Sequence, residues 1–337
     1  MKDKTQILHS ITKRILITTT ENEVEAVKHL NEFYTQFETS DDIEGDIHLT
    51  NGIALSKKHA ADCIKDYKRT SRFLKGVYKA IVSCAENFPD TELNILYAGC
   101  GPYATLVLPL LSFFKPEQLN ITLLDINKSS IESIKRIVSE LKMDSYFGDI
   151  IVADATTYKY PETLNLHLVI SETMFNALTK EPQVAVTDNL APQLIEKGIL
   201  IPEEIDVSMG YSFFSKEPFL NQFDNEYYVS NTTNKPIERD APETLFVLNK
   251  KTSKNVKLVD SNYFESRLFT IPTDFQNKPD ICLYTRIKIF DSIDLQNEDS
   301  LITNPFCIAS LYNLPKESKF RINYNIKNSP NWGVTIY

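Results

Sequence analysis

The sequence has few of the residues from which metal centres and disulfide frameworks are built. Its five cysteines are scattered and form no C-x-x-C pair, and all five histidines lie in the first half of the chain, none paired at the spacing of a metal site. An odd number of scattered cysteines indicates neither a disulfide framework nor a zinc site. We therefore expect a protein without a bound metal.

Basic charge and long apolar runs are also scarce. Lys and Arg number 36 against 45 Asp and Glu, a net charge of -9, and this balance argues against a nucleic-acid partner because duplex binders neutralise phosphates with a basic surface. No apolar run reaches the roughly 18 residues of a membrane span. The N-terminus is a poor signal peptide because Lys13 and Arg14 interrupt its short apolar pieces. We therefore expect a cytoplasmic protein without a membrane partner.

Glycine is rare as well, yet two of the nine glycines lie in one triplet, Gly99-Cys100-Gly101. The triplet follows an apolar segment, Leu93–Ala98, which we expect to be a buried strand. Glycines at such a point let the backbone turn tightly and approach a ligand beside the start of the next helix. A glycine turn without a ligand is the alternative, because a G-x-G pattern alone is weak.

Strands and helices alternate between residues 93 and 201, which favours parallel βαβ units with right-handed crossovers. We predict strands at 93–98, 121–124, 149–153, 166–170 and 198–201, helices at 129–142 and 183–196, and a helix or apolar turn at 104–114. Earlier in the chain, helical spacing of apolar residues occurs at 21–37 and 56–86. Residues 40–54, acidic and then turn-like, are expected to be a linker.

After about residue 205 the segments become short, aromatic and β-branched, as in IDVSMGYSFF and KFRINYNI. Turn-forming Asn, Pro and Asp residues separate them, which favours an antiparallel barrel or sandwich. The chain has 337 residues, enough for two domains at about 100–200 residues each. We expect a helical extension and linker at 1–55, a Rossmann-like α/β domain at 56–203 and a β-rich substrate domain at 204–337.

Acidic residues follow the second and third predicted strands. Asp125 ends the second strand, where a carboxylate can accept both hydroxyl hydrogens of a ribose; on its own it could instead cap the next helix. Asp154, followed by Ala155, ends the third strand, where the adenine amino group lies in a methyltransferase. Dinucleotides and S-adenosylmethionine both use this layout. We favour S-adenosylmethionine because the α/β part contains no Tyr-x-x-x-Lys pair, and keep a nicotinamide oxidoreductase as another class.

Residues 93–202 resemble the cofactor domain of class I methyltransferases, and more closely that of the protein arginine methyltransferases. Ser171-Glu172-Thr173-Met174 is similar to the S-E-x-M loop of that family, and Glu181 stands at the spacing of its second glutamate. Upstream, the segment Asp66 to Thr70 resembles the family motif D-x-x-R-T. The strand entry EKGILIPEE and the β-rich region that follows are also similar, so the resemblance spans roughly residues 56–310.

The resemblance implies S-adenosylmethionine as the cofactor and a set of site residues. Glu172 and Glu181 would be catalytic, because two carboxylates on one loop can clamp a planar cation through paired charge-assisted hydrogen bonds. The implied activity is N-methylation of a guanidino or amino group on a protein, peptide or small molecule. The implied cofactor contacts are Arg69, which would hold the cofactor carboxylate, and Gly99, Gly101, Asp125, Asp154, Ala155 and Met174.

Three departures from the family leave the acceptor open. The family pairs the histidine of a T-H-W loop with a helix aspartate, but here no histidine follows His167 and the only tryptophan is Trp332. NGIALSKKHAADCI stands in place of a tyrosine-rich start, and residues 205–260 contain no recognisable dimerisation arm, so a homodimer stays open. The alternatives are O- or C-methylation of a small molecule, and a non-catalytic cofactor-binding relative.

Overall fold

The structure, a computed structural model, describes residues 3–19, 22–38, 45–223, 226–230, 240, 242–252, 263–273, 275, 277–315 and 318–337. The helices are α1 (Lys4–Ile17), α2 (Glu23–Thr35), α3 (Lys57–Asp62), α4 (Tyr67–Asn87), α5 (Lys128–Glu140) and α6 (Gln183–Leu190). The 3-10 helices are η2 (Cys63–Lys65), η3 (Leu108–Phe113), η4 (Pro116–Gln118), η5 (Asp144–Tyr146), η6 (Asn176–Leu178), η7 (Ala191–Gln193), η8 (Phe214–Lys216) and η10 (Leu301–Thr303).

The strands fall into a first group before residue 202 and a second group after it. The first group is β1 (Ile47–Leu49), β2 (Gly52–Ala54), β3 (Leu93–Ala98), β4 (Leu119–Asp125), β5 (Phe147–Val152), β6 (Leu166–Ser171) and β7 (Leu194–Ile201). The second is β8 (Glu204–Ser212), β9 (Phe219–Phe223), β10 (Glu226–Ser230), β11 (Glu243–Asn249), β12 (Tyr263–Glu265), β13 (Phe269–Thr270), β14 (Asp280–Phe290), β15 (Ile293–Leu295), β16 (Phe306–Ser310), β17 (Lys319–Asn325) and β18 (Asn331–Ile336).

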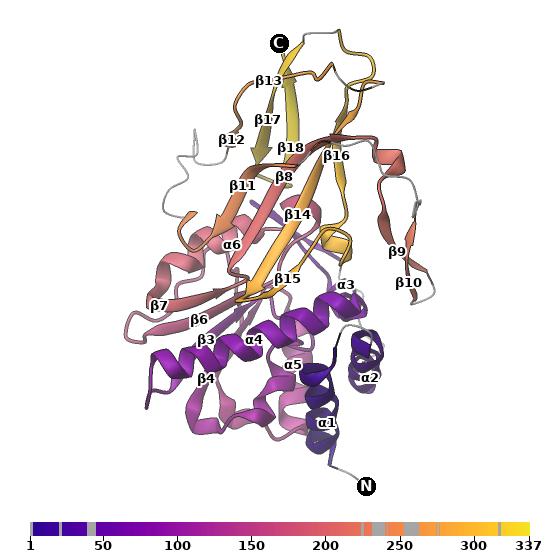
Figure 1. Cartoon of the computed structure of the whole chain (residues 1–337). Helices are drawn as coiled ribbons and strands as arrows, with labels where there is room; N and C mark the ends of the chain where they lie inside the picture. The colour runs from indigo at the N-terminus through magenta and orange to yellow at the C-terminus, as the bar shows by residue number, and fades with distance from the viewer. Residues whose placement is uncertain are drawn as a thin grey trace.

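Strands β3 to β7 form one parallel sheet in the order β5-β4-β3-β6-β7 (Figure 1). Every residue of β3 and β6 is buried, as expected for central strands covered on both faces. The predicted Rossmann-like sheet is therefore confirmed. The chain leaves β3 toward β4 on one side and later returns to β6 on the other. The carboxyl ends of these strands therefore meet at the switch point where open α/β sheets bind ligands.

Two predicted helices end or break earlier than expected. The helix predicted at 183–196 is wrong beyond Leu190. Pro192 cannot continue the helix, and β7 already begins at Leu194. The predicted helix at 56–86 consists of α3, η2 and α4. Asp66 has a non-helical backbone and caps α4, its side chain accepting from the Arg69 N–H. The segment at 104–114 is an apolar turn that ends in η3.

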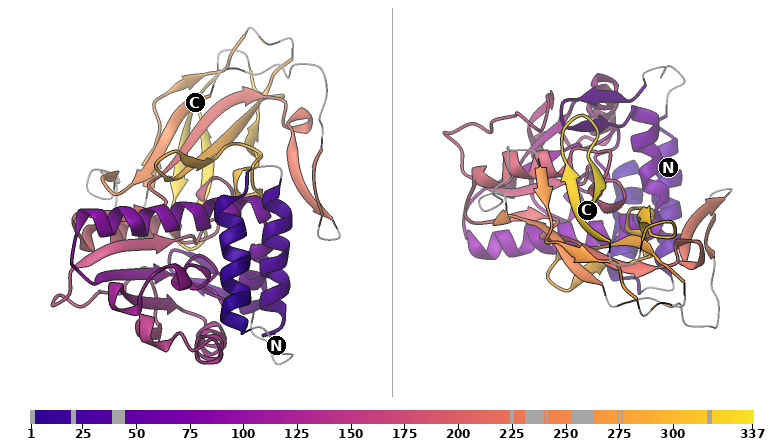
Figure 2. Two further views of the ribbon diagram at one scale, coloured as in Figure 1. Left: turned by 60° about the horizontal axis from the view of Figure 1, so that its bottom comes forward. Right: turned by 90° about the horizontal axis from the view of Figure 1, so that it is seen from above.

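The N-terminal part contains more helix than the sequence predicts. The predicted helix at 21–37 is confirmed as α2, and α1 precedes it, with Leu8 and Ile15 fully buried. The two helices lie side by side against α4 (Figure 2). Of the predicted linker at 40–54, residues up to 44 lie outside the described residues. Residues 47–54 form the hairpin β1–β2, so the linker prediction is wrong there.

The antiparallel region predicted after residue 205 is confirmed. Strands β8, β11, β14, β15 and β16 form one sheet, and β12, β13, β17 and β18 form a second. Phe246 on the first sheet packs against Phe264, Tyr324 and Trp332 on the second, so the two sheets face each other. Strands β9 and β10 form a hairpin that projects to one side (Figures 1 and 2). Within the described residues these strands form open sheets and no closed barrel.

Helix α4 lies between the two sheet systems. It contacts β6 and β7 of the parallel sheet and β14 and β15 of the first antiparallel sheet (Figure 1). Buried side chains from both parts join in one core. The domain limits at 56–203 and 204–337 stay a prediction.

No helix in the described ranges is long and apolar enough to cross a membrane.

Candidate active site

The carboxyl ends of β3 to β6 open into a cavity of about 1000 Å³, part of it open to solvent. Eight of the nine residues singled out in the sequence line it: Arg69, Gly99, Gly101, Asp125, Asp154, Ala155, Glu172 and Glu181. Met174 is the exception, because its side chain is buried in the core and does not line the cavity. Residues from five separate stretches of the chain therefore meet in one place, four of them at or after strands of the parallel sheet and the fifth on α4.

The turn after β3 requires glycine for two physical reasons. Gly99 and Gly101 have φ values of 70° and 62°, in the left-handed region that side chains disfavour. A Cβ on Gly99 would also lie 2.3 Å from the Cγ2 of Thr173, on the loop that follows β6. The turn thus places its backbone directly against the loop that carries Glu172.

Asp125 faces the glycine turn and does not cap the next helix. Its two carboxylate oxygens each accept a backbone N–H, one from Gly101 and one from Asn127, at 2.8 Å. Asn127 is the residue that caps α5, so the alternative interpretation of Asp125 as a helix cap is wrong. Burial raises the pKa of the Asp125 carboxyl, and the backbone N–H groups partly offset this. At the end of β5, Asp154 accepts the N–H and hydroxyl of Thr156.

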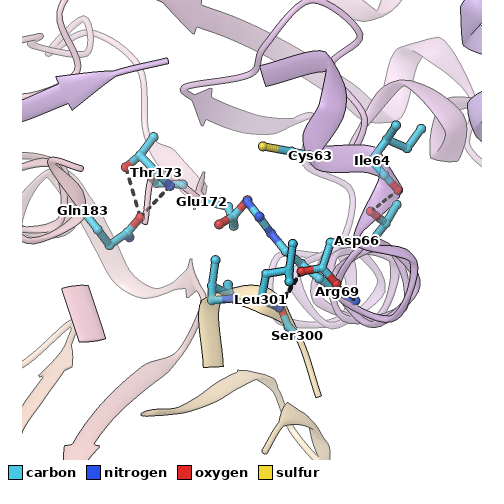
Figure 3. Close-up of polar contacts among 12 residues, drawn as sticks. Cys63, Ile64, Asp66, Arg69, Glu172, Thr173, Gln183, Ser300 and Leu301 are labelled. Carbon is cyan, nitrogen blue, oxygen red and sulfur yellow. Dashed lines mark hydrogen bonds and ion pairs between the residues drawn. The ribbon is translucent and has the colours of Figure 1, made fainter. Parts of the chain in front are cut away.

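Arg69 extends from α4 into the cavity and forms an ion pair with Glu172 Oε2 (Figure 3). Both side chains are largely buried, with exposed fractions of 11% and 9%. Among the described residues, no hydrogen-bond donor reaches the other oxygen, Glu172 Oε1. A buried acceptor without a partner costs about 1–3 kcal/mol. A donor that enters the cavity would therefore be bound favourably at this oxygen.

Glu181 lies in the same cavity wall and has a perturbed acidity. The pKa of its carboxyl is raised to about 7, mainly by burial. This value includes two smaller effects: the Arg69 guanidinium lowers the pKa, and the Asp46 carboxylate raises it. A cation beside Glu181 would favour the ionised form, so this carboxyl can respond to the charge of a bound ligand.

The aspartate of the D-x-x-R-T motif has partners that sequence reasoning missed. Asp66 Oδ2 accepts the Ser300 hydroxyl at 2.6 Å and the Leu301 N–H at 3.0 Å (Figure 3). Ser300 and Thr303 form a capping box around η10, a spacing readable in the sequence. No local pattern connects Ser300 with an aspartate 234 residues away.

The hairpin β1–β2 also contributes to the wall, although its segment was expected to be a linker. Leu49, Ile53 and Leu55 line the cavity, and the Ile53 N–H donates to the Lys180 carbonyl at 2.8 Å. Sequence reasoning missed this contact because the hairpin is short and its strands have three residues each. The apolar hairpin therefore closes one side of the cavity next to Glu181.

No family model and no curated protein matches the chain. Among solved structures, the chain is similar to one in the Trypanosoma brucei PRMT1 enzyme-prozyme heterotetrameric complex with AdoHcy. The TM-score is 0.50 at 11% sequence identity, and the match covers 82% of this chain and 96% of that chain. At this identity the likeness shows a shared fold and nothing further about the chain.

Proposed function

We propose that the chain is an S-adenosylmethionine-dependent methyltransferase that methylates a guanidino or amino nitrogen. The observation that carries this proposal is Glu172, a buried carboxylate with one oxygen on Arg69 and the other without a donor among the described residues. It lies in one cavity with the glycine turn, Asp125 and Glu181. The solved structure of similar fold contains AdoHcy, which supports the choice of cofactor.

The residues of the cavity fit this cofactor chemically. Each oxygen of Asp125 accepts one N–H, and a carboxylate oxygen has a further lone pair for a ribose hydroxyl. The glycine turn allows close approach of the backbone, Asp154 and Ala155 would contact the adenine, and Arg69 would bind the carboxylate. When bound, the cofactor supplies an electrophilic methyl group on a sulfonium.

The two glutamates would then hold the acceptor. Glu172 Oε1 and the Glu181 carboxylate can each accept a hydrogen bond from a cationic nitrogen, while Arg69 fixes the orientation of Glu172. Methyl transfer needs in-line approach of the nucleophile more than proton chemistry, so positioning supplies much of the rate. Burial of Glu172 strengthens its interaction with a cation, because the local dielectric is low.

The acidity of Glu181 supports O-methylation as a second candidate. A carboxyl with a pKa of about 7 is suited to act as a general base at neutral pH. It could then remove the proton of a hydroxyl acceptor. The two candidate reactions take acceptors of different charge. Guanidino and amino compounds should compete for the site under the first, and neutral hydroxyl compounds under the second. Release of S-adenosylhomocysteine with each class of compound separates them.

Calorimetric titration with S-adenosylmethionine tests the cofactor site. We expect the wild-type chain to bind and Asp125→Asn to bind at least tenfold more weakly, since loss of a charged acceptor in a buried site costs about 1–3 kcal/mol. Asp188→Asn is the matched control. It removes a carboxylate of α6 that does not line the cavity and whose pKa burial raises to about 6. Absence of binding to the wild type, or equal weakening in both variants, would contradict the assignment.

A further inference from the structure

The loop between the two glutamates has an unusual backbone. Ala177, Leu178 and Lys180 have φ values of 51°, 59° and 65°, in the left-handed region that residues with a side chain rarely adopt. Three such residues within four positions form a strained segment directly before Glu181. A conformation of this kind persists only where the surrounding structure holds it.

Two side chains from the end of the chain bind the carbonyls of this segment. Trp332 Nε1 donates to the Ala177 carbonyl at 2.7 Å, and the Tyr324 hydroxyl donates to the Leu178 carbonyl at 2.6 Å. The next strained residue, Lys180, is held through its backbone: its N–H donates to the Pro330 carbonyl at 2.7 Å. Every left-handed residue of the loop therefore has a hydrogen bond to the β17–β18 region.

The two donors are themselves held rigidly. Tyr324 and Trp332 lie opposite each other on β17 and β18, and their ring centroids are 4.7 Å apart. Phe246 of the facing sheet packs against both rings, and Phe264 packs against Trp332. A buried Trp N–H or Tyr O–H usually has an acceptor, and here the strained loop supplies it. The aromatic cluster thus connects the β sheets to the loop that carries the glutamates.

We propose that Trp332 and Tyr324 are positioning residues that hold residues 177–180 in this conformation and thereby place Glu181 in the cavity wall. The role of the loop in acceptor binding rests on the proposed function, whereas the holding contacts do not.

Hydrogen exchange measured by mass spectrometry tests the holding contacts without cofactor or acceptor. Trp332→Phe and Tyr324→Phe each keep an aromatic ring and remove one donor. Phe264→Leu is the matched control, because it changes the same aromatic cluster and contributes no hydrogen bond to the loop. We expect exchange of the amides at 178–181 to be at least tenfold faster in the two donor variants and unchanged in the control. Equal exchange in all three variants overturns the proposal.

Enzyme kinetics test the consequence for the site. We expect both donor variants to lower kcat about tenfold relative to Phe264→Leu, with an unchanged Kd for S-adenosylmethionine. The pH at half-maximal turnover should also fall, because a released Glu181 gains solvent and its raised pKa returns toward the ordinary value. Faster exchange with turnover equal to the control overturns the positioning role. If the wild-type chain transfers no methyl group, the proposed function fails while the exchange experiment still decides the holding contacts.

Discussion

Glu172 and Glu181 lie in one cavity wall but have different surroundings. Glu172 is paired with Arg69 through one oxygen and has a free acceptor in the other within the described residues. No ion pair of Glu181 occurs among the described residues, and burial raises its pKa to about 7. Neutralising Glu172 should therefore mainly lower turnover, whereas neutralising Glu181 should mainly change the pH dependence of stability.

Glu172→Gln keeps the shape of the side chain and removes its charge. The amide oxygen can still accept from Arg69, so we expect S-adenosylmethionine affinity to change less than threefold. Turnover with a cationic acceptor should fall a hundredfold or more, about 3 kcal/mol for a charged hydrogen bond lost in a desolvated site. Steady-state kinetics and calorimetry measure the two effects. The exposed Glu86→Gln on α4 is the control, and full activity of Glu172→Gln would refute the clamp.

Glu181→Gln should stabilise the fold at high pH. Because the folded pKa of about 7 lies above the ordinary value of 4.5, the folded chain keeps a proton there that the unfolded chain has lost. Stability of the wild type therefore falls as pH rises between these values. At pH 8 the variant should be more stable by roughly 1–3 kcal/mol, and at pH 4.5 the difference should vanish. Denaturant titrations at both pH values check this, and a constant difference would contradict it.

The start of α4 and the short helix η10 depend on each other through Asp66. Its buried carboxylate caps α4 at the Arg69 N–H and accepts from Ser300 and Leu301. Arg69 lies one turn further along the same helix, so this cap fixes where its guanidinium enters the cavity. Contacts between an element of the α/β part and one of the β-rich part thus support the proposed cofactor site.

Ser300→Ala removes a donor to Asp66 and the side-chain cap of Ile302. We expect a loss of about 1–3 kcal/mol, because a buried carboxylate is left with one donor fewer and η10 loses its cap. Chemical denaturation measures the change in the free energy of unfolding. Ser310→Ala, at an exposed position on β16, should change it by less than about 0.5 kcal/mol. Equal effects of both variants would show that Ser300 has no special role.

The two parts of the molecule share one core along α4. At Gly76 the helix approaches β14 so closely that a Cβ would lie 2.4 Å from the Cγ2 of Ile289. Helix propensity favours alanine over glycine by about 1 kcal/mol, whereas overpacking a core costs about 1–3 kcal/mol. The steric cost should therefore dominate at this position.

We expect Gly76→Ala to lower the free energy of unfolding by about 1–2 kcal/mol, the balance of these two effects. Unfolding should remain one transition, because the buried cluster continues from α4 into β14. Denaturation followed by circular dichroism and tryptophan fluorescence measures both, since Trp332 reports on the β-rich part. Stabilisation, or two separate transitions, would show that the parts pack more loosely than the structure indicates.

Local sequence patterns are sufficient to predict the parallel strands and the polar residues that follow them at the cavity. Continuous apolar runs specify buried parallel strands, and polar residues directly after them must lie at one edge of the sheet. Gly99, Asp125, Asp154 and Glu172 can therefore be placed together from the order of residues alone. Helix ends are predicted less well where a cap or a proline, such as Asp66 or Pro192, interrupts an otherwise helical pattern.

Long-range contacts are decided by the tertiary structure alone. Asp66 and Ser300, Arg69 and Glu172, and Leu178 and Tyr324 are separated by more than a hundred residues in each case. Periodicity reports which face of an element is buried and contains no information on which distant element covers that face. The acidity of Glu181 likewise follows from burial by several segments of the chain. The strands and the polar residues at their carboxyl ends can thus be read from local sequence, whereas the pairing and protonation of the two glutamates arise only when distant elements pack together.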